Sequence, residues 1–183
     1  PAFVTHRNHF RIAYRGQPLY GGRDPAENAL RRIKGRIMRI GNQLLDPPLL
    51  LAPMAGVTHS AFRRLVSDFG GYGALFTEML SARSLPHDNM TESPFVKRRP
   101  CEGRVIYQLN LTGNEPIEPI LDSLKRTDAE FLDINLGCPA PIIKRQGAGK
   151  ALFDNFDQLE KTLLQYRKQW DKPLSVKCRL GNE

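Results

Sequence analysis

The stretch Asp133-Ile134-Asn135-Leu136-Gly137-Cys138-Pro139-Ala140-Pro141 decides the fold class and the chemistry that we expect of this chain. The apolar run from Phe131 to Asn135 predicts a buried strand, which then breaks into a Gly-Cys-Pro turn. The turn places the Cys138 thiol just beyond the carboxyl end of that strand, where β/α proteins carry their chemistry. Because most lone cysteines are small buried hydrophobes, the turn alone leaves a functional thiol and an inert one equally open.

Short apolar runs alternate with amphipathic segments after residue 46. The runs that predict strands are 49–52, 74–77, 105–109, 131–135 and 174–178, and the segments that predict helices are 60–69, 115–125 and 154–170. This order requires a parallel sheet with right-handed crossovers, either doubly wound or closed into a barrel. Since the glycine signatures of nucleotide-binding doubly wound sheets are missing from the sequence, we favour a TIM-type (β/α)8 barrel. Such barrels typically need about 250 residues, so this chain would hold about the first five β/α units.

Local patterns predict further details of packing. The segment from Leu49 to Ala52 is wholly apolar, which is typical of a strand buried on both faces. Residues 36–45 predict a hairpin that turns at Gly41-Asn42. Residues 80–103 form a long polar connection, either a functional loop or a simple insertion. Helix 60–69 should be capped by Thr58 or Ser60 and should bury an apolar stripe of Ala61, Phe62, Leu65, Val66 and Phe69.

The net charge of +8 is concentrated in the first quarter of the chain. Residues 1–45 carry nine Lys and Arg against two acidic residues, whereas the remainder carries eighteen against seventeen. We expect residues 1–35 to be a basic, partly disordered extension of a globular part at 36–183. Basic arms favour polyanions, RNA above all, while a solvated tail and an organelle-targeting segment are the alternatives. The candidate phosphate contacts are Arg31, Arg32, Lys34 and Arg36.

The three cysteines are Cys101, Cys138 and Cys178, an odd number without C-x-x-C spacing. This argues against a disulfide framework and against a metal site, and it favours a reducing, cytoplasmic compartment. No apolar run approaches the roughly 18 residues of a membrane span, and a signal-peptide pattern is missing from the sequence. Since the chain begins at Pro1 rather than at a methionine, we expect a trimmed or fragmentary protein.

Polar and flexible side chains follow the predicted strands where a barrel would bring them to one mouth. They are Pro53-Met54-Ala55, Glu78-Met79, Gln108, Asn135 with Cys138, and Lys177. Amide groups offer paired donors and acceptors, and a lysine at the end of a buried strand requires an anion or an electron-rich partner. Together these residue types suit a planar heteroaromatic cofactor beside a thiol. The alternatives are a strand cap for Gln108 and core filler for Met54.

Six motifs occur in an order that resembles one enzyme family. They are Leu-Ala-Pro-Met-Ala-Gly-Val-Thr (51–58), Thr-Glu-Met (77–79), Tyr-Gln-Leu (107–109), Asp-Ile-Asn-Leu-Gly-Cys-Pro (133–139), Gly-Ala-Gly (147–149) and Val-Lys-Cys-Arg-Leu-Gly (176–181). This combination resembles the tRNA-dihydrouridine synthases, which are flavin-dependent (β/α)8-barrel reductases. The resemblance runs from about Ile37 to the end of the chain and leaves residues 1–35 outside it.

The resemblance implies bound FMN, reduced by NADPH, and the reduction of a uridine in tRNA to 5,6-dihydrouridine. It implies that Cys138 donates a proton, with Asn135 beside it in the same motif, and it assigns the flavin contacts to Pro53, Met54, Ala55, Gln108 and Lys177. In this chemistry uracil C6 receives a hydride and C5 a proton. Free thiols have a pKa of about 8.5, so a thiol can act as that acid at neutral pH. Ile142 departs from the polar or basic residue frequent in the family, and Cys178 replaces an aliphatic residue, which predicts a core position.

The resemblance also implies elements that would lie beyond Glu183: a phosphate grip from the last strands, a His-Gly-Arg motif and a helical tRNA-binding domain. We therefore expect the 183-residue chain alone to be catalytically inert and to bind FMN weakly. Two rival functions stay open. One is another FMN-dependent barrel oxidoreductase acting on a small dihydropyrimidine-like molecule, and the other is a non-catalytic, RNA-associating remnant.

Overall fold

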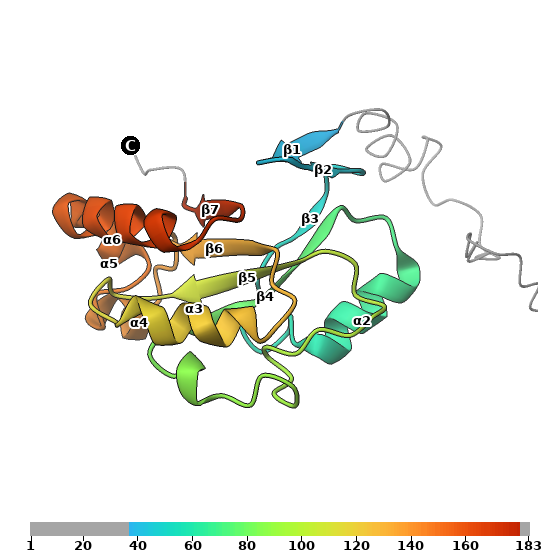
Figure 1. Ribbon diagram of the computed structural model, residues 1–183, viewed down its shortest axis with the longest axis horizontal. Helices are drawn as coiled ribbons and strands as arrows, with labels where there is room; N and C mark the ends of the chain where they lie inside the picture. The colour runs from blue at the N-terminus through green and yellow to red at the C-terminus, as the bar shows by residue number, and fades with distance from the viewer. Residues whose placement is uncertain (1–36, 180–183) are drawn as a thin grey trace, which may run out of the picture.

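A five-stranded parallel sheet forms the centre of the structure, a computed structural model that describes residues 37–179 (Figure 1). Its order follows the chain: β3 (Leu50–Leu51), β4 (Ala74–Ser81), β5 (Val105–Asn110), β6 (Phe131–Asn135) and β7 (Leu174–Lys177). Each strand therefore pairs with the strands next to it in sequence, as in a β/α barrel. The predicted parallel sheet is confirmed, and the strand predicted at 131–135 has the observed bounds.

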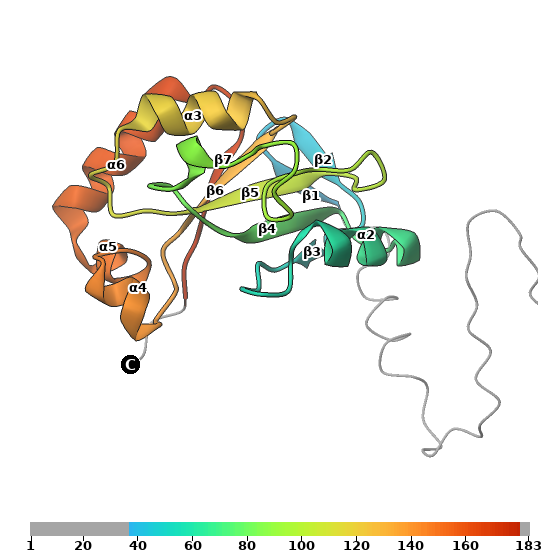
Figure 2. The same cartoon turned by 90° about the horizontal axis from the view of Figure 1, so that it is seen from below.

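The sheet curls, and the helices lie on its outer side (Figure 2). The helices between β3 and β7 are α2 (Ser60–Phe69), α3 (Ile117–Lys125), α4 (Pro141–Arg145), α5 (Lys150–Asp154) and α6 (Phe156–Gln169), with a 3-10 turn, η1, at Leu85–His87. The structure is thus an α/β fold whose curled parallel sheet forms a half-barrel. Helices α4 and α5 were not predicted, because helices of five residues are too short to show an amphipathic period.

Alternate residues of the strands face two different environments, as the period of two requires. On β5, Tyr107 and Leu109 belong to the large core between sheet and helices, which also contains Leu132 and Ile134 of β6. Ile106 belongs to a second, smaller cluster on the inner face of the curl. The inner face therefore also carries the next residues in alternation, among them Gln108.

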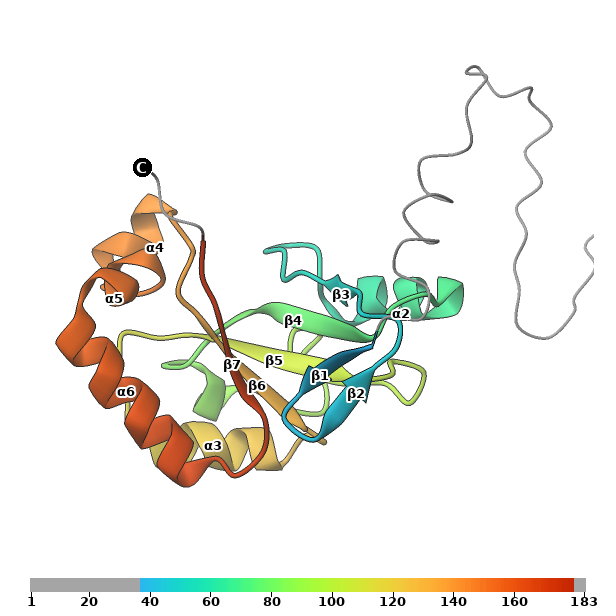
Figure 3. The same cartoon turned by 90° about the horizontal axis from the view of Figure 1, so that it is seen from above.

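A hairpin covers the amino-terminal end of this inner face (Figure 3). It consists of β1 (Met38–Ile40) and β2 (Gln43–Leu45), and it turns at Gly41-Asn42 as predicted. Met38, Ile40 and Leu45 pack against the small cluster that includes Ile106. One end of the curl is thus filled with apolar side chains, which leaves the carboxyl ends of the strands as the place for a site.

Two packing predictions are wrong at the β3 edge of the sheet. Leu50 of β3 is 37% exposed rather than buried on both faces, because this edge strand has a single neighbour, β4. Helix α2 buries Ser60 and Arg63, whereas Leu65 and Phe69 of the predicted apolar stripe are 51% and 64% exposed. The helix is preceded by His59 without a side-chain cap, so neither Thr58 nor Ser60 is the cap that we predicted.

Arg63 faces inward because it closes a buried ion pair. Its Nε lies 2.8 Å from Glu102 Oε2, and both side chains are fully buried. Its other nitrogens donate to the carbonyl oxygens of Thr58 at 2.7 Å and Lys97 at 2.6 Å, and Ser60 Oγ donates to Glu102 Oε1 at 3.0 Å. The 80–103 connection is thereby tied to α2, and it also buries Leu85, Met90 and Val96, so it is a packed part of the domain.

Candidate active site

Polar side chains occupy the inner face of the sheet above the apolar cluster. Pairing in the sheet aligns Gln108 of β5 with Asp133 of β6, and Asp133 with Ser175 of β7. One step closer to the carboxyl ends, Asn135 of β6 is aligned with Lys177 of β7. Gln108 and Asp133 are buried at 0% and 1% exposure, and Asn135 is 6% exposed, so the sheet holds three polar groups in a largely dry environment.

These side chains form one continuous chain of hydrogen bonds. It ends at the Gly-Cys-Pro turn of residues 137–139, the thiol loop. Ser175 Oγ donates to Asp133 Oδ1 at 2.6 Å, and Gln108 Nε2 donates to Asp133 Oδ2 at 2.6 Å. Asn135 Nδ2 donates to Gln108 Oε1 at 2.9 Å. Asn135 Oδ1 in turn accepts the backbone N–H groups of Gly137 at 3.2 Å and Cys138 at 3.0 Å. The predicted residues Gln108, Asn135 and Cys138 are therefore brought together.

Asp133 belongs to this chain of hydrogen bonds, although it was not among the candidate site residues predicted from the sequence. Burial raises the pKa of its carboxyl group above the ordinary value of 3.8, although the hydrogen bonds from Ser175 and Gln108 and the charge of Lys177 oppose this rise. The signal was present in the sequence, since residues 133 and 135 of one strand face the same side of a sheet. An acidic residue two positions before a predicted site residue was therefore a candidate.

The Gly-rich segment after Cys138 brings the chain back against the thiol loop. Lys150 N donates to the Cys138 carbonyl oxygen at 3.1 Å. Gly149 has a φ of +59°, and a Cβ atom there would lie 2.8 Å from the Cys138 carbonyl oxygen and 3.1 Å from the Cys138 Cβ. Glycine is required both for this backbone conformation and for this close approach. Cys138 itself is half-buried, so this hydrogen-bonded loop is still partly accessible to solvent.

The loop after β3 is attached to the neighbouring strand through Glu78. Glu78 Oε2 accepts the backbone N–H of Gly56 at 2.8 Å, while Thr58 Oγ1 accepts the N–H of Met54 at 3.0 Å. The register of β4 shifts between Phe76 and Met79, and the strand continues to Ser81 rather than ending at Thr77 as predicted. Glu78 is 8% exposed, and its Oε1 atom has no hydrogen-bond partner within residues 37–179.

The other predicted flavin contacts flank these groups. Met54 is 39% exposed, and Pro53 and Ala55 adjoin it in the loop after β3. Lys177 is exposed at the end of β7, opposite Asn135 in the pairing. The sheet therefore places the Pro53–Ala55 loop at one edge and Lys177 at the other, with Gln108 and Asn135 between them.

Cys178 does not lie in the core, contrary to our prediction. It is exposed, because β7 is an edge strand of the described sheet and ends at Lys177. Cys101 is exposed as well, and all three cysteines are free thiols. Within residues 37–179 no group of three His, Cys, Asp or Glu side chains could hold a metal ion, and no helix is long and apolar enough to cross a membrane. The predicted phosphate contacts Arg31, Arg32, Lys34 and Arg36 lie outside the described residues.

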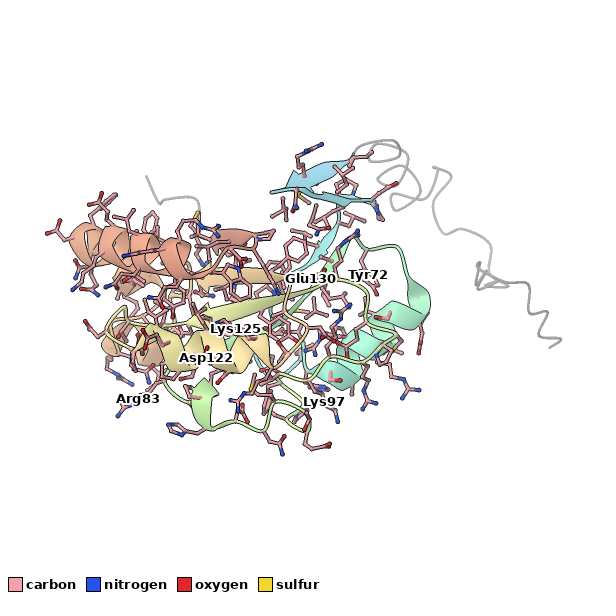
Figure 4. All side chains as sticks on the ribbon, in the orientation of Figure 1. Tyr72, Arg83, Lys97, Asp122, Lys125 and Glu130 are labelled. Carbon is pink, nitrogen blue, oxygen red and sulfur yellow. The ribbon has the colours of Figure 1, made fainter. Side chains whose placement is uncertain are left out.

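A cavity of about 460 Å³ adjoins the Gly-rich segment that follows the thiol loop. Its floor includes Ser81 and Asn110, which are paired at the ends of β4 and β5, and its wall includes Gln146 and Ala148 of the Gly-rich segment. The facing loop is shaped by Glu115, whose carboxylate accepts the backbone N–H groups of Thr112 and Gly113. Arg83 lies at the rim and is seen in Figure 4 on the α4 side of the molecule.

A curled parallel sheet with inward polar groups and a thiol loop at the carboxyl ends of its strands defines a protein of the β/α-barrel class. Residues 50–183 match the family model described as dihydrouridine synthase (Dus), and the chain therefore belongs to the dihydrouridine synthase family. The expectation that we drew from the six motifs is thus confirmed at the level of the family.

Several curated relatives carry tRNA-dihydrouridine synthase names. The chain is 34% identical over 146 residues to tRNA-dihydrouridine synthase B of Pasteurella multocida (strain Pm70), covering 79% of this chain and 43% of the relative. It is 34% identical over 142 residues to a probable tRNA-dihydrouridine synthase of Rhodobacter capsulatus, covering 75% and 42%. It is 32% identical over 134 residues to a tRNA-dihydrouridine(47) synthase [NAD(P)(+)]-like protein of Rattus norvegicus, covering 73% and 21%. The chain thus spans less than half the length of these relatives.

Proposed function

We propose that this chain supplies the thiol-bearing part of an enzyme that uses FMN and NADPH to reduce a uridine of tRNA to 5,6-dihydrouridine. The observation that carries the proposal is the chain of hydrogen bonds that joins Gln108, Asn135 and the backbone of Cys138. The names of the relatives support tRNA as the substrate. We further propose that the five strands belong to an eight-stranded barrel, with residues 36–183 as its first part and residues 1–35 as a basic extension.

The hydrogen-bonding groups left free at the site fit a flavin ring. Gln108 and Asn135 each use one amide hydrogen within the protein, so each keeps one N–H to donate to a ring carbonyl or nitrogen. Glu78 Oε1 is a buried acceptor without a partner among the described residues, and a ring imide N–H is a donor of the required kind. We therefore propose that Gln108, Asn135 and Glu78 contact the ring, with Met54 and its neighbours Pro53 and Ala55 against it.

Lys177 and Cys138 have chemical roles in this proposal. When bound and reduced, the flavin would supply a hydride to the uracil ring. Lys177, aligned with Asn135, would stabilise negative charge on the cofactor. Cys138 would then donate its thiol proton to the carbanionic carbon of the uracil, as a general acid. The hydrogen bond from its backbone to Asn135 holds the loop that carries this thiol.

We propose that the cavity beside the Gly-rich segment receives part of the tRNA substrate. Its volume of about 460 Å³ is in the range of ligand pockets, which is about 300–1,000 Å³. A nucleotide adjacent to the reduced uridine would find amide and hydroxyl groups at Asn110, Thr112 and Gln146, and Arg83 at the rim would meet its phosphate. We propose that the arm residues Arg31, Arg32, Lys34 and Arg36 add further phosphate contacts. The cytoplasmic location stays a prediction.

The test combines a product assay with a flavin titration. With the protein at its native length, FMN and NADPH, we expect 5,6-dihydrouridine in tRNA by mass spectrometry and no reduction of free uracil. Reduction of the free base with tRNA unchanged would favour a small-molecule oxidoreductase. Salt-sensitive RNA binding without flavin absorbance would favour the RNA-associating remnant.

A second measurement concerns the 183 residues alone, which we expect to be inert and to bind FMN weakly, because barrel phosphate sites typically come from the last two strands. Fluorescence titration with size-exclusion chromatography checks this. A monodisperse monomer with submicromolar FMN affinity would show that these 183 residues suffice for the cofactor site.

A further inference from the structure

We infer that Asp133 is a positioning residue: it fixes the orientation of both site amides and, through them, the backbone that carries Cys138. The inference deepens the proposed function, since it rests on Cys138 as the proton donor. It concerns a buried carboxyl group that the proposed chemistry does not otherwise use.

The orientation of the first amide is determined at the thiol loop. The backbone N–H groups of Gly137 and Cys138 can only donate, so the Asn135 atom that they approach must be the oxygen. The Asn135 amide nitrogen then faces Gln108 and donates to it. Gln108 must in turn present its oxygen to Asn135 and its nitrogen to residue 133.

The same orientation of the two amides is required at the other end of the hydrogen-bond chain, at Asp133. Both carboxyl oxygens of Asp133 accept a hydrogen bond, one from Gln108 and one from Ser175, each at 2.6 Å. Every donor between Cys138 and Asp133 therefore points toward Asp133. Without an acceptor at position 133, Gln108 Nε2 would be buried without a partner, at a residue that is 0% exposed.

Reversing the amide of Gln108 or of Asn135 does not restore a partner for every donor. A reversed Gln108 would present its nitrogen to the nitrogen of Asn135, and a reversed Asn135 would present its nitrogen to the N–H groups of the thiol loop. The disturbance is thus passed along to Cys138. A buried carboxyl group that served stability alone would have no such directed effect on the thiol.

Two variants of Asp133 separate hydrogen-bond orientation from charge. Asp133→Leu removes the acceptor at similar volume. Asp133→Asn removes the charge but keeps an oxygen for Gln108, since its amide nitrogen can donate to Ser175 Oγ. If orientation is what matters, the Asn variant should preserve the thiol loop and the Leu variant should not.

The readout is the rate at which iodoacetamide alkylates each thiol, measured by mass spectrometry of peptides. Exposed Cys101 is the reference within the same molecule. We expect Asp133→Leu to change the Cys138 rate relative to Cys101 by about tenfold or more, because a buried hydrogen bond is lost. For Asp133→Asn, the ratio of the Cys138 and Cys101 alkylation rates should stay within about threefold of that in the parent chain.

Amide hydrogen exchange of the Gly137–Cys138 peptide gives a second readout with the same expected ranking. An unchanged Cys138 in a folded Asp133→Leu variant would overturn the inference, and so would an Asn variant as disturbed as the Leu variant. If Asp133→Leu does not fold, Gln108→Met interrupts the same chain and should give the same change, and an unchanged Cys138 there would also overturn it. None of these measurements depends on catalytic activity, so their failure is distinct from failure of the proposed function.

Discussion

The side chain of Asn135 binds the backbone of Cys138, with Asn135 Oδ1 accepting the Cys138 N–H at 3.0 Å. The same oxygen accepts the N–H of Gly137 at 3.2 Å, so the end of β6 and the thiol loop form one hydrogen-bonded unit. On the other side Gly149 lies against Cys138. The thiol is therefore held between an amide and a glycine, and changes at either contact should alter its position.

Substitution of Gly149 should displace the thiol loop, whereas the same change at Gly147 should not. Both residues have a positive φ, +59° and +81°, but a Cβ at Gly147 has no neighbour within 4 Å, whereas at Gly149 it would lie 2.8 Å from the Cys138 carbonyl oxygen. Gly147→Ala thus tests an alanine at positive φ without a contact to Cys138, at a cost of about 1 kcal/mol. We expect Gly149→Ala to lower turnover at least about tenfold more than Gly147→Ala. Equal turnover in the two variants would contradict a positioning role for Gly149.

Replacement of the thiol should remove the proton donor and retain the cofactor. We expect Cys138→Ala to lower dihydrouridine formation by about 10²–10⁴-fold, the usual contribution of a general acid. Flavin absorbance should be unchanged, because the proposed ring contacts come from other residues. Exposed Cys101 and Cys178 provide matched controls, since alanine at either position should leave turnover within about twofold. Full activity of Cys138→Ala would refute its assignment as the acid.

Loss of Arg63 should destabilise the domain strongly. Arg63→Met leaves Glu102 fully buried without its ionic partner, which typically costs about 3–5 kcal/mol in the free energy of unfolding. The double variant with Glu102→Leu should recover most of that loss. Urea denaturation measures the free energy of unfolding of the single and the double variant. The exposed pair of Asp122 and Lys125 on α3, seen in Figure 4, is the control, and Lys125→Ala should change stability by less than about 0.5 kcal/mol.

The stability of the domain should carry a pH dependence that comes from Asp133. Because burial raises the pKa of this carboxyl group above 3.8, the folded chain binds its proton more tightly than the unfolded chain does. Its contribution to stability is therefore greatest below 3.8 and falls as the pH rises through the raised pKa. Asp133→Asn cannot titrate, so its stability relative to the parent chain should rise as the pH increases from below 3.8 through the raised pKa of Asp133. A difference that does not vary with pH in urea denaturation would contradict the raised pKa.

Removal of Arg83 should weaken tRNA binding in a salt-dependent way. If Arg83 meets a phosphate at the rim of the cavity, Arg83→Ala should reduce the slope of log affinity against log salt by about one. Exposed Arg64 on α2 is a control with the same change in charge, away from the cavity. Filter binding over a range of salt concentrations measures both slopes. If Arg64→Ala and Arg83→Ala flatten the slope equally, the effect is one of net charge, and the cavity is not a phosphate site.

The order of the elements and the turn that carries the thiol follow from local patterns in the sequence. The alternation of apolar runs and amphipathic segments predicted a parallel sheet, and the bounds of β6 and the hairpin turn at Gly41-Asn42 are as predicted. These features are local, because strand period, turn residues and the Gly-Cys-Pro break are each properties of a few adjacent residues. Gln108, Asn135 and Cys138 were predicted for the same reason, as residues at the ends of apolar runs, and their roles in a site stay predictions.

Which groups these elements contact depends on how the chain folds in three dimensions. The apolar period of α2 predicted a buried Leu65 and Phe69, but the buried partner of Arg63 on this helix is Glu102, 39 residues along the chain, so Arg63 faces inward. Likewise Cys178 looked like a core residue in sequence and is exposed because its strand lies at an edge. Periodicity measures how apolar residues are spaced, but which face is covered, and whether a buried carboxyl such as Asp133 finds donors, depends on neighbours that are distant in sequence.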